Sequence, residues 1–202
     1  MNKTFMLIVS FFLITAPVSA MQIEADPRVI ISFMDKSLPP ELDILRVTTD
    51  VSEDNHLIFQ VQTKGERING KNNDYILLNI LHEKTYALII PLNTETEELL
   101  LVYEGELHPE KQLATIAFNK SELNKEHAGF STRRINRGVE FTIPLDWINF
   151  GADLGFDAYT IQASIKGNAL YIDEVYDQAR RGPQEKRISA ITLLNNICSP
   201  KK

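Results

Sequence analysis

The sequence predicts an all-β fold, an antiparallel β-sandwich with at most short helices. Three observations favour this class. Apolar and polar residues alternate with a period of two along most of the chain, turn-forming residues separate the alternating stretches, and no amphipathic pattern of three helical turns interrupts them. A closed β-barrel is the alternative, because one sequence does not distinguish the two arrangements.

The first predicted strands flank a polar turn. Residues 42–49 form one strand, and Leu57, Phe59 and Val61 alternate with glutamines in the next, which is typical of a strand with one face in water. Residues 50–55 lie between them and are rich in side chains that hydrogen-bond their own backbone. This segment therefore predicts the turn of a hairpin.

The middle of the chain predicts two more strand pairs. Residues 75–81 and 86–92 are nearly continuous apolar runs, and the four polar residues between them suit a tight hairpin. Residues 98–103 and 112–118 form the second pair, with Gly105 and Pro109 in the connection.

A polar stretch over residues 119–138 then interrupts the alternation. Residues 120–127 suit a short helix, and residues 131–134 predict a loop.

The last part of the chain returns to strands. Residues 139–145 alternate and include Pro144, which a strand tolerates at an edge or at its end. Residues 159–165, 170–175 and 188–194 are the remaining predicted strands, and a tail begins at about residue 195.

Length and charge exclude several classes of protein. The chain has 202 residues and a formal net charge of −6, so it suits one domain and argues against nucleic acid as the partner. It has a single cysteine, Cys198, which excludes both a disulfide framework and a cysteine-rich zinc site.

The N-terminus has the pattern of a secretory signal peptide. Lys3 precedes an apolar run over residues 5–14, and small residues stand at Val18 and Ala20. The run is too short for a membrane span, which needs about 20 residues. We therefore expect cleavage between Ala20 and Met21, a single domain over residues 21–202, no stable insertion in a membrane, and a location in the periplasm or outside the cell.

Two regions resemble a known family. Residues 42–50 have the sequence LDILRVTTD and residues 55–63 have NHLIFQVQT, while residues 139–147 have VEFTIPLDW and precede the strand at 156–165. Together with a tyrosine-bearing strand at 75–81, they resemble the secreted β-sandwich domains called DOMON-like or family 9 carbohydrate-binding-like.

The resemblance implies a sandwich fold and a carbohydrate ligand. Members of that family typically clamp a sugar between aromatic planes, often two tryptophans, whereas Trp147 is the only tryptophan here. Haem-binding members use histidine or methionine as axial ligands, and no such pair maps onto this chain.

Two arginine-rich segments predict an anion site. Guanidinium groups match the geometry of phosphate, sulfate and acidic sugars, so convergence of the two segments in space would create such a site. A solvated charged surface is the alternative. The residues are Arg133, Arg134, Arg137, Arg180 and Arg181.

Three aromatic residues with a polar atom are candidates for a ligand surface: Trp147, Tyr171 and Tyr176. Acidic residues are close to the two tyrosines in the sequence, which favours exposure of both tyrosines at the surface. Burial with a satisfied polar atom is the commoner state of such residues.

Four oxygen-bearing residues cluster in the first turn: Asp50, Glu53, Asp54 and Asn55. Ca²⁺ takes oxygen ligands of these types, but the spacing is not that of an EF-hand. The alternative is a solvated hairpin tip with no metal.

The sequence shows no assembled catalytic set. It lacks a Gly-x-Ser-x-Gly elbow, and its four histidines are scattered. We therefore expect a secreted, non-enzymatic protein without a cofactor that binds a glycan or a protein surface. The alternatives are a virulence effector of a Gram-negative bacterium released by type II secretion, and a small secreted hydrolase.

Overall fold

The computed structural model describes residues 26, 28–33, 35–66, 73–93, 100–105, 117–120, 129–180 and 188–199. The strands of this part of the chain are β1 (Val29–Ile31), β2 (Ile44–Val51), β3 (His56–Thr63), β4 (Asp74–Leu81), β5 (Thr85–Pro91), β6 (Leu101–Gly105), β7 (Ala117–Lys120), β8 (Ser131–Ile135), β9 (Gly138–Pro144), β10 (Asp153–Lys166), β11 (Ala169–Ala179) and β12 (Ile188–Ser189). A 3₁₀ helix, η2 (Leu145–Trp147), follows β9, and the α-helix α1 (Ala190–Cys198) follows β12.

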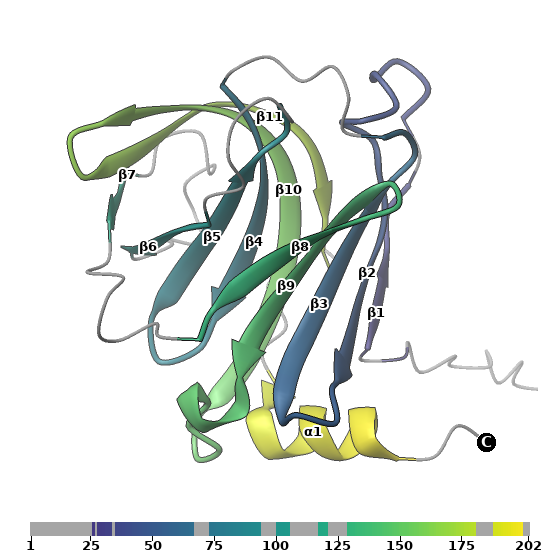
Figure 1. Cartoon of the computed structure of the whole chain (residues 1–202), viewed down its shortest axis with the longest axis vertical. Coiled ribbons are helices and arrows are strands. Elements are labelled where there is room, and N and C mark those ends of the chain that lie inside the picture. The colour runs from purple at the N-terminus through teal and green to yellow at the C-terminus, as the bar shows by residue number, and fades with distance from the viewer. Residues whose placement is uncertain are drawn as a thin grey trace, which may run out of the picture.

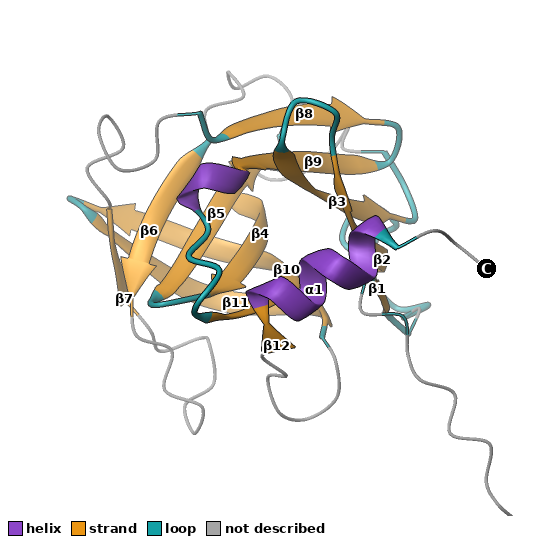
Figure 2. Ribbon diagram, turned by 90° about the horizontal axis from the view of Figure 1, so that it is seen from below, coloured by secondary structure: helices purple, strands orange, loops and turns teal. Residues whose placement is uncertain are grey.

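The strands form two antiparallel sheets. The first has the order β1-β2-β3-β9-β8, and the second has the order β11-β7-β6-β5-β4-β10-β12 (Figure 1). Figure 2 shows the two sheets from one end, with α1 lying across the opening between them. The prediction of an antiparallel β-sandwich is confirmed, and the strands do not form one closed barrel.

The first hydrophobic core lies between the sheets. Alternate residues of β3 and its neighbour β9 point into it, because Phe59 stands opposite Phe141 and Leu57 opposite Ile143, all fully buried. Phe59 also meets Phe156 of the second sheet, with ring centroids 5.0 Å apart in an edge-on arrangement. This core joins the two layers of the sandwich.

A second hydrophobic core lies on the other face of the second sheet. That sheet curls, because β11 pairs with β10 along most of its length and also with β7 through residues 169–171. The curl encloses side chains that include Tyr75, Leu77, Tyr103 and Tyr159. The inner strands β4 and β5 are therefore buried on both faces, which explains why their sequences are nearly continuous apolar runs.

The predicted strand over residues 188–194 is wrong beyond Ser189. Residues 190–198 form α1, and the buried residues Ala190, Leu193 and Ile197 follow helical spacing on one face. Residues 195–198, which the sequence predicts as part of a tail, therefore belong to α1. Among the described residues, no helix has both the length and the apolar character needed to cross a membrane.

The predicted loop over residues 131–134 is also wrong, because these residues form β8 at the edge of the first sheet. Arg137 turns the chain into β9 with a positive φ of 57°. The next residue, Gly138, passes so close to the carbonyl oxygen of Val61 that no Cβ would fit. The turn brings β8 against β9.

Some predicted elements lie outside the described residues. These are residues 121–127 of the short helix, residues 98–99 of one strand and residues 112–116 of another. Residue 120, at the start of the predicted helix, is the last residue of β7.

Candidate functional site

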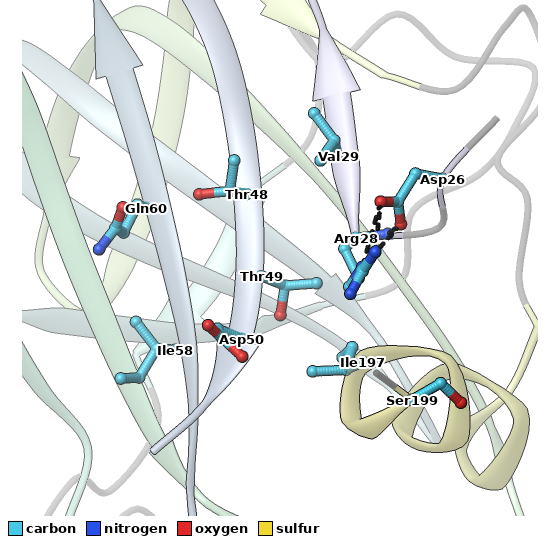
Figure 3. A pocket seen from close by; sticks show the side chains of 10 residues that line it. All are labelled: Asp26, Arg28, Val29, Thr48, Thr49, Asp50, Ile58, Gln60, Ile197 and Ser199. Carbon is cyan, nitrogen blue, oxygen red and sulfur yellow. Dashed lines mark hydrogen bonds and ion pairs between the residues drawn. The ribbon is translucent and has the colours of Figure 1, made fainter. Parts of the chain in front are cut away.

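A pocket opens where β1 begins, between the first two strands and the C-terminal end of α1 (Figure 3). Its volume is about 320 Å³, which is at the lower end of the range for small-molecule sites. Most of its wall is polar: Asp26, Arg28, Thr48, Thr49, Asp50, Gln60 and Ser199. Val29, Ile58 and Ile197 provide its apolar part.

A short-range ion pair fixes the charged corner of the pocket. Arg28 donates from Nε and Nη2 to the two carboxylate oxygens of Asp26, with donor–acceptor distances of 2.8 to 3.1 Å. The backbone N–H of Arg28 donates to the same carboxylate at 2.9 Å. The side-chain hydrogen bonds to Asp26 and the charge of its carboxylate raise the pKa of Arg28 above its ordinary value of 12.5, so the guanidinium stays charged.

Thr49 is the unusual residue of the wall. It lies in β2 with 4% of its surface exposed, and its Oγ1 has no hydrogen-bond partner within the described part of the chain. A buried hydroxyl without a partner costs about 1–3 kcal/mol, so native proteins pair such groups with protein, water or ligand. Thr49 therefore marks a position where a bound hydroxyl or water would gain a hydrogen bond.

Three other polar residues of the wall make side-chain hydrogen bonds of their own. Asp50 accepts from the N–H of Val51 at 2.8 Å, and Ser199 donates from Oγ to the carbonyl oxygen of Asn195 at 2.6 Å. Gln60 donates from Nε2 to Glu140 at 2.9 Å. The pocket thus combines donors and acceptors, several of them on side chains that hydrogen bonds hold in place.

The predicted arginine residues fall in different places. Arg133 in β8 donates from Nε and Nη2 to Oε1 of Glu140, at 3.0 and 2.8 Å. Arg134 neighbours it on the same strand, and Arg137 is in the following turn. Arg180 is exposed just beyond β11 of the second sheet, and Arg181 lies outside the described residues. Convergence of the two segments remains a prediction.

Trp147 belongs to an aromatic cluster at the rim of the first core. Its ring lies 4.9 Å from Tyr86, 5.1 Å from Phe130 and 5.5 Å from His82, measured between centroids. His82 in turn contacts the carbonyl oxygen of Asp153 through Nδ1 and accepts the N–H of Asn149 at Nε2. These contacts give Trp147 a packing role, and its role in ligand binding stays a prediction.

The two candidate tyrosines differ in environment. Tyr171 is 41% exposed on β11, and the Lys166 ammonium lies 5.2 Å from its ring centroid. Tyr176 packs against the first core and donates its hydroxyl to Asp74 Oδ1 at 3.0 Å. Burial and this hydrogen bond raise the pKa of Tyr176 to about 12. Tyr171 is therefore exposed, whereas Tyr176 is partly buried.

The acidic turn has the geometry of a hairpin tip. Asn55 adopts a positive φ of 58°, and the N–H of His56 donates to Oγ of Ser52 at 3.1 Å. Glu53 and Asp54 are exposed there. Within the described ranges, no three carboxylate, histidine or cysteine side chains come together in a way that would hold a metal ion.

Among the pocket residues, only Asp50 is one of the site residues that the sequence predicts. The pocket is assembled from the segment before β1, from β1, β2 and β3, and from the end of α1, so no local sequence motif indicates it. One signal was present: Thr49 is polar, although it lies on the same face of the strand as Val47 and Val51, which point toward the core.

Comparison of the chain with family models, with curated proteins and with solved structures gives no match.

Proposed function

We propose that the chain is an exported binding protein without enzymatic activity, and that it holds a sugar unit in the pocket at the start of β1. The observation that most favours a ligand here is the buried hydroxyl of the wall residue Thr49, which has no partner in the described residues. A ligand hydroxyl that reached this group would satisfy it.

The lining supports a polyhydroxylated ligand. A sugar hydroxyl donates one hydrogen bond and accepts others. The carboxylate of Asp50 accepts, the guanidinium of Arg28 donates, and the hydroxyls of Thr48 and Thr49 do both. Ile58 adds apolar surface of the kind that packs against the C–H groups of a sugar ring.

The carboxylates support binding rather than hydrolysis. Glycosidases require one carboxyl group that acts as an acid and a second that acts as a base or nucleophile. The pocket has two carboxylates, Asp26 and Asp50, but Asp26 is held by three hydrogen bonds from the Arg28 side chain. Both oxygens of the Asp26 carboxylate are therefore already engaged by protein donors.

The location proposed for this activity is the periplasm or the cell exterior. The pattern of residues 1–20 supports export, and the pocket residues all follow the expected cleavage site. Expression of the full chain should yield a protein whose N-terminus is Met21. Fractionation of the culture then distinguishes the periplasm from the medium.

A glycan array followed by calorimetric titration tests the proposal. The exported form should bind at least one immobilised glycan, and Thr49→Val should weaken that binding by about tenfold or more. Valine has the same shape but no hydroxyl, so the free energy of unfolding should stay the same or rise.

Thr192→Val is the matched control, because Thr192 is exposed on α1 and does not line the pocket. It should leave glycan binding unchanged. Absence of any bound glycan on the array, or unchanged affinity in Thr49→Val, would overturn the proposal.

A further inference from the structure

The first sheet has two edges of different character (Figure 1). One edge is β8, whose exposed residues include Arg133 and Arg134. Charged side chains on an edge strand oppose pairing with a strand of another molecule. The other edge is β1, and residues 29–33, which run along it, have the uncharged sequence VIISF. This edge therefore lacks the protection that β8 has.

Large apolar side chains are exposed along β1. The exposed fraction is 77% for Ile31 and 95% for Phe33, the two highest values among the large hydrophobic residues of the described chain. Val29 and these two residues alternate with the buried Ile30, so all three lie on the solvent face of the sheet. Contiguous exposed apolar side chains of this kind mark an interaction site.

The backbone of β1 also presents polar groups to this edge. The carbonyl oxygen of Arg28 accepts an N–H of β2 at 2.8 Å, and the N–H of Ser32 donates to a carbonyl oxygen of β2 at 3.0 Å. Because the bonds of an antiparallel ladder involve alternate residues, the carbonyl oxygen of Val29, both polar groups of Ile31 and the N–H of Phe33 point away from β2. No strand of the described chain pairs with β1 on that side.

A second copy of β1 complements this edge. When two copies pair in antiparallel fashion about Ile31, each Ile31 exchanges two hydrogen bonds with its counterpart, and each Phe33 N–H donates to the Val29 carbonyl oxygen of the other copy. The same register sets the side chains of Val29 and Phe33 opposite each other, and those of the two Ile31 residues opposite one another. Aromatic and β-branched side chains in such cross-strand pairs stabilise a sheet.

The charges at the ends of the segment suit the same arrangement. Asp26 and Arg28 stand before the apolar run, and Asp35 and Lys36 stand after it. Antiparallel pairing brings the first end of one copy toward the second end of the other, so each junction holds two acidic and two basic groups. The formal net charge of −6 on the whole chain is therefore not concentrated at this contact. The arginines of β8 offer β1 no such match.

We infer that β1 pairs with β1 of a second copy, so that the two five-stranded sheets become one continuous sheet. The pairing is symmetric and uses the open edge of both copies, so it yields a closed dimer and not a filament. The contact is small, because each Phe33 adds at most about 150–250 Å², whereas stable interfaces bury about 1,200 Å² or more. We therefore expect a reversible dimer with a dissociation constant of about 1–100 μM. The inference does not depend on the ligand of the pocket.

Sedimentation equilibrium of the exported form tests the inference. Between about 1 and 300 μM, the mean mass should rise from that of one chain toward that of two. Ile31→Pro should raise the dissociation constant by about tenfold or more, because proline removes the central donor of the new ladder. The N–H of Ile31 points away from β2, so the β1–β2 ladder and the fold should survive this change.

Two further variants guard against a loss of folding. Phe33→Ser changes a side chain that is 95% exposed, and it should raise the dissociation constant by about threefold or more through the loss of its cross-strand pairs. Ile191→Ser, at a 51% exposed position of α1, is the matched control. It removes exposed apolar surface outside the sheet and should change nothing. Circular dichroism and the thermal unfolding midpoint report whether each variant folds.

Three results would overturn the inference. These are a mean mass of one chain throughout the series, growth beyond two chains, and a dissociation constant that is the same in folded Ile31→Pro or in Phe33→Ser as in the natural protein. If Ile31→Pro does not fold, Phe33→Ser decides alone. The sedimentation series needs no saccharide and the glycan array needs no dimer, so each proposal can fail while the other stands.

Discussion

Asn79 is a buried polar residue without a visible structural purpose. It lies in the middle of β4 and is fully buried, on the face that Leu77 presents to the second core. Neither its Oδ1 nor its Nδ2 has a hydrogen-bond partner in the part of the chain that the structure describes. Each such group costs free energy of folding that an apolar side chain would not.

We therefore predict that Asn79→Leu stabilises the protein. Leucine has the same branching and number of side-chain atoms, so the free energy of unfolding should rise by about 1–2 kcal/mol in urea titrations. Asn196→Leu, at an exposed position of α1, is the control and should change it by no more than about 0.5 kcal/mol. A loss of stability in Asn79→Leu would show that a buried water satisfies the asparagine.

Asp177 gives a prediction about pH. Burial raises its pKa above the ordinary value of 3.8, and the charges of Asp43 and Asp35 act in the same direction. Hydrogen bonds from the N–H groups of Ile44 and Gln178 oppose the shift without cancelling it. The ammonium of Lys64 lies nearby, 3.7 Å from Asp43.

A raised carboxyl pKa means that the folded state holds the proton more tightly than the unfolded state. The stability contributed by Asp177 is therefore complete below pH 3.8 and is lost as the pH rises through the folded-state pKa. Asp177→Asn removes this loss. Its free energy of unfolding, relative to the natural protein, should increase as the pH rises above 3.8 and then level off. A difference that does not vary with pH in urea titrations would contradict this account.

At the scale of elements, the central strands could be predicted because their patterns are local. Alternation located β3 and β9 to within one or two residues, and the continuous apolar runs located β4 and β5. Those runs also indicate burial on both faces. The sequence did not show what covers the second face, because the curl depends on β11 pairing with both β10 and β7.

The wrong predictions of secondary structure concern segments whose local sequence pattern suits more than one element. Residues 188–194 are apolar enough for a short strand, but Ala190, Leu193 and Ile197 also have helical spacing. Burial of these three side chains on one face stabilises the helix instead. Residues 131–134 lack alternation because β8 is an edge strand with polar side chains on both faces. The pocket could not be predicted, since segments distant in sequence meet there.

At the scale of the whole molecule, one sheet separates two hydrophobic cores. The strands β4, β5 and β10 supply alternate side chains to the core between the sheets and to the core inside the curl. The proposed binding pocket lies at the edge of the other sheet and borders the first core, to which its wall residue Ile197 belongs. None of the residues that line it comes from the second sheet.

Because the two cores share strands, we expect them to unfold together. Leu78 and Leu77 are neighbours on β4 that point into the first and the second core respectively, and both are fully buried. Leu78→Ala and Leu77→Ala should each cost about 2–5 kcal/mol. The loss in the free energy of unfolding should be the same whether it is measured from Trp147 fluorescence or from the hydrogen-exchange protection of β11 peptides, as one cooperative transition requires.

If Leu77→Ala lowered protection in β11 while the unfolding midpoint from Trp147 fluorescence stayed unchanged, the curled half of the second sheet would be an independent folding unit. The shared strands would then fail to couple the cores.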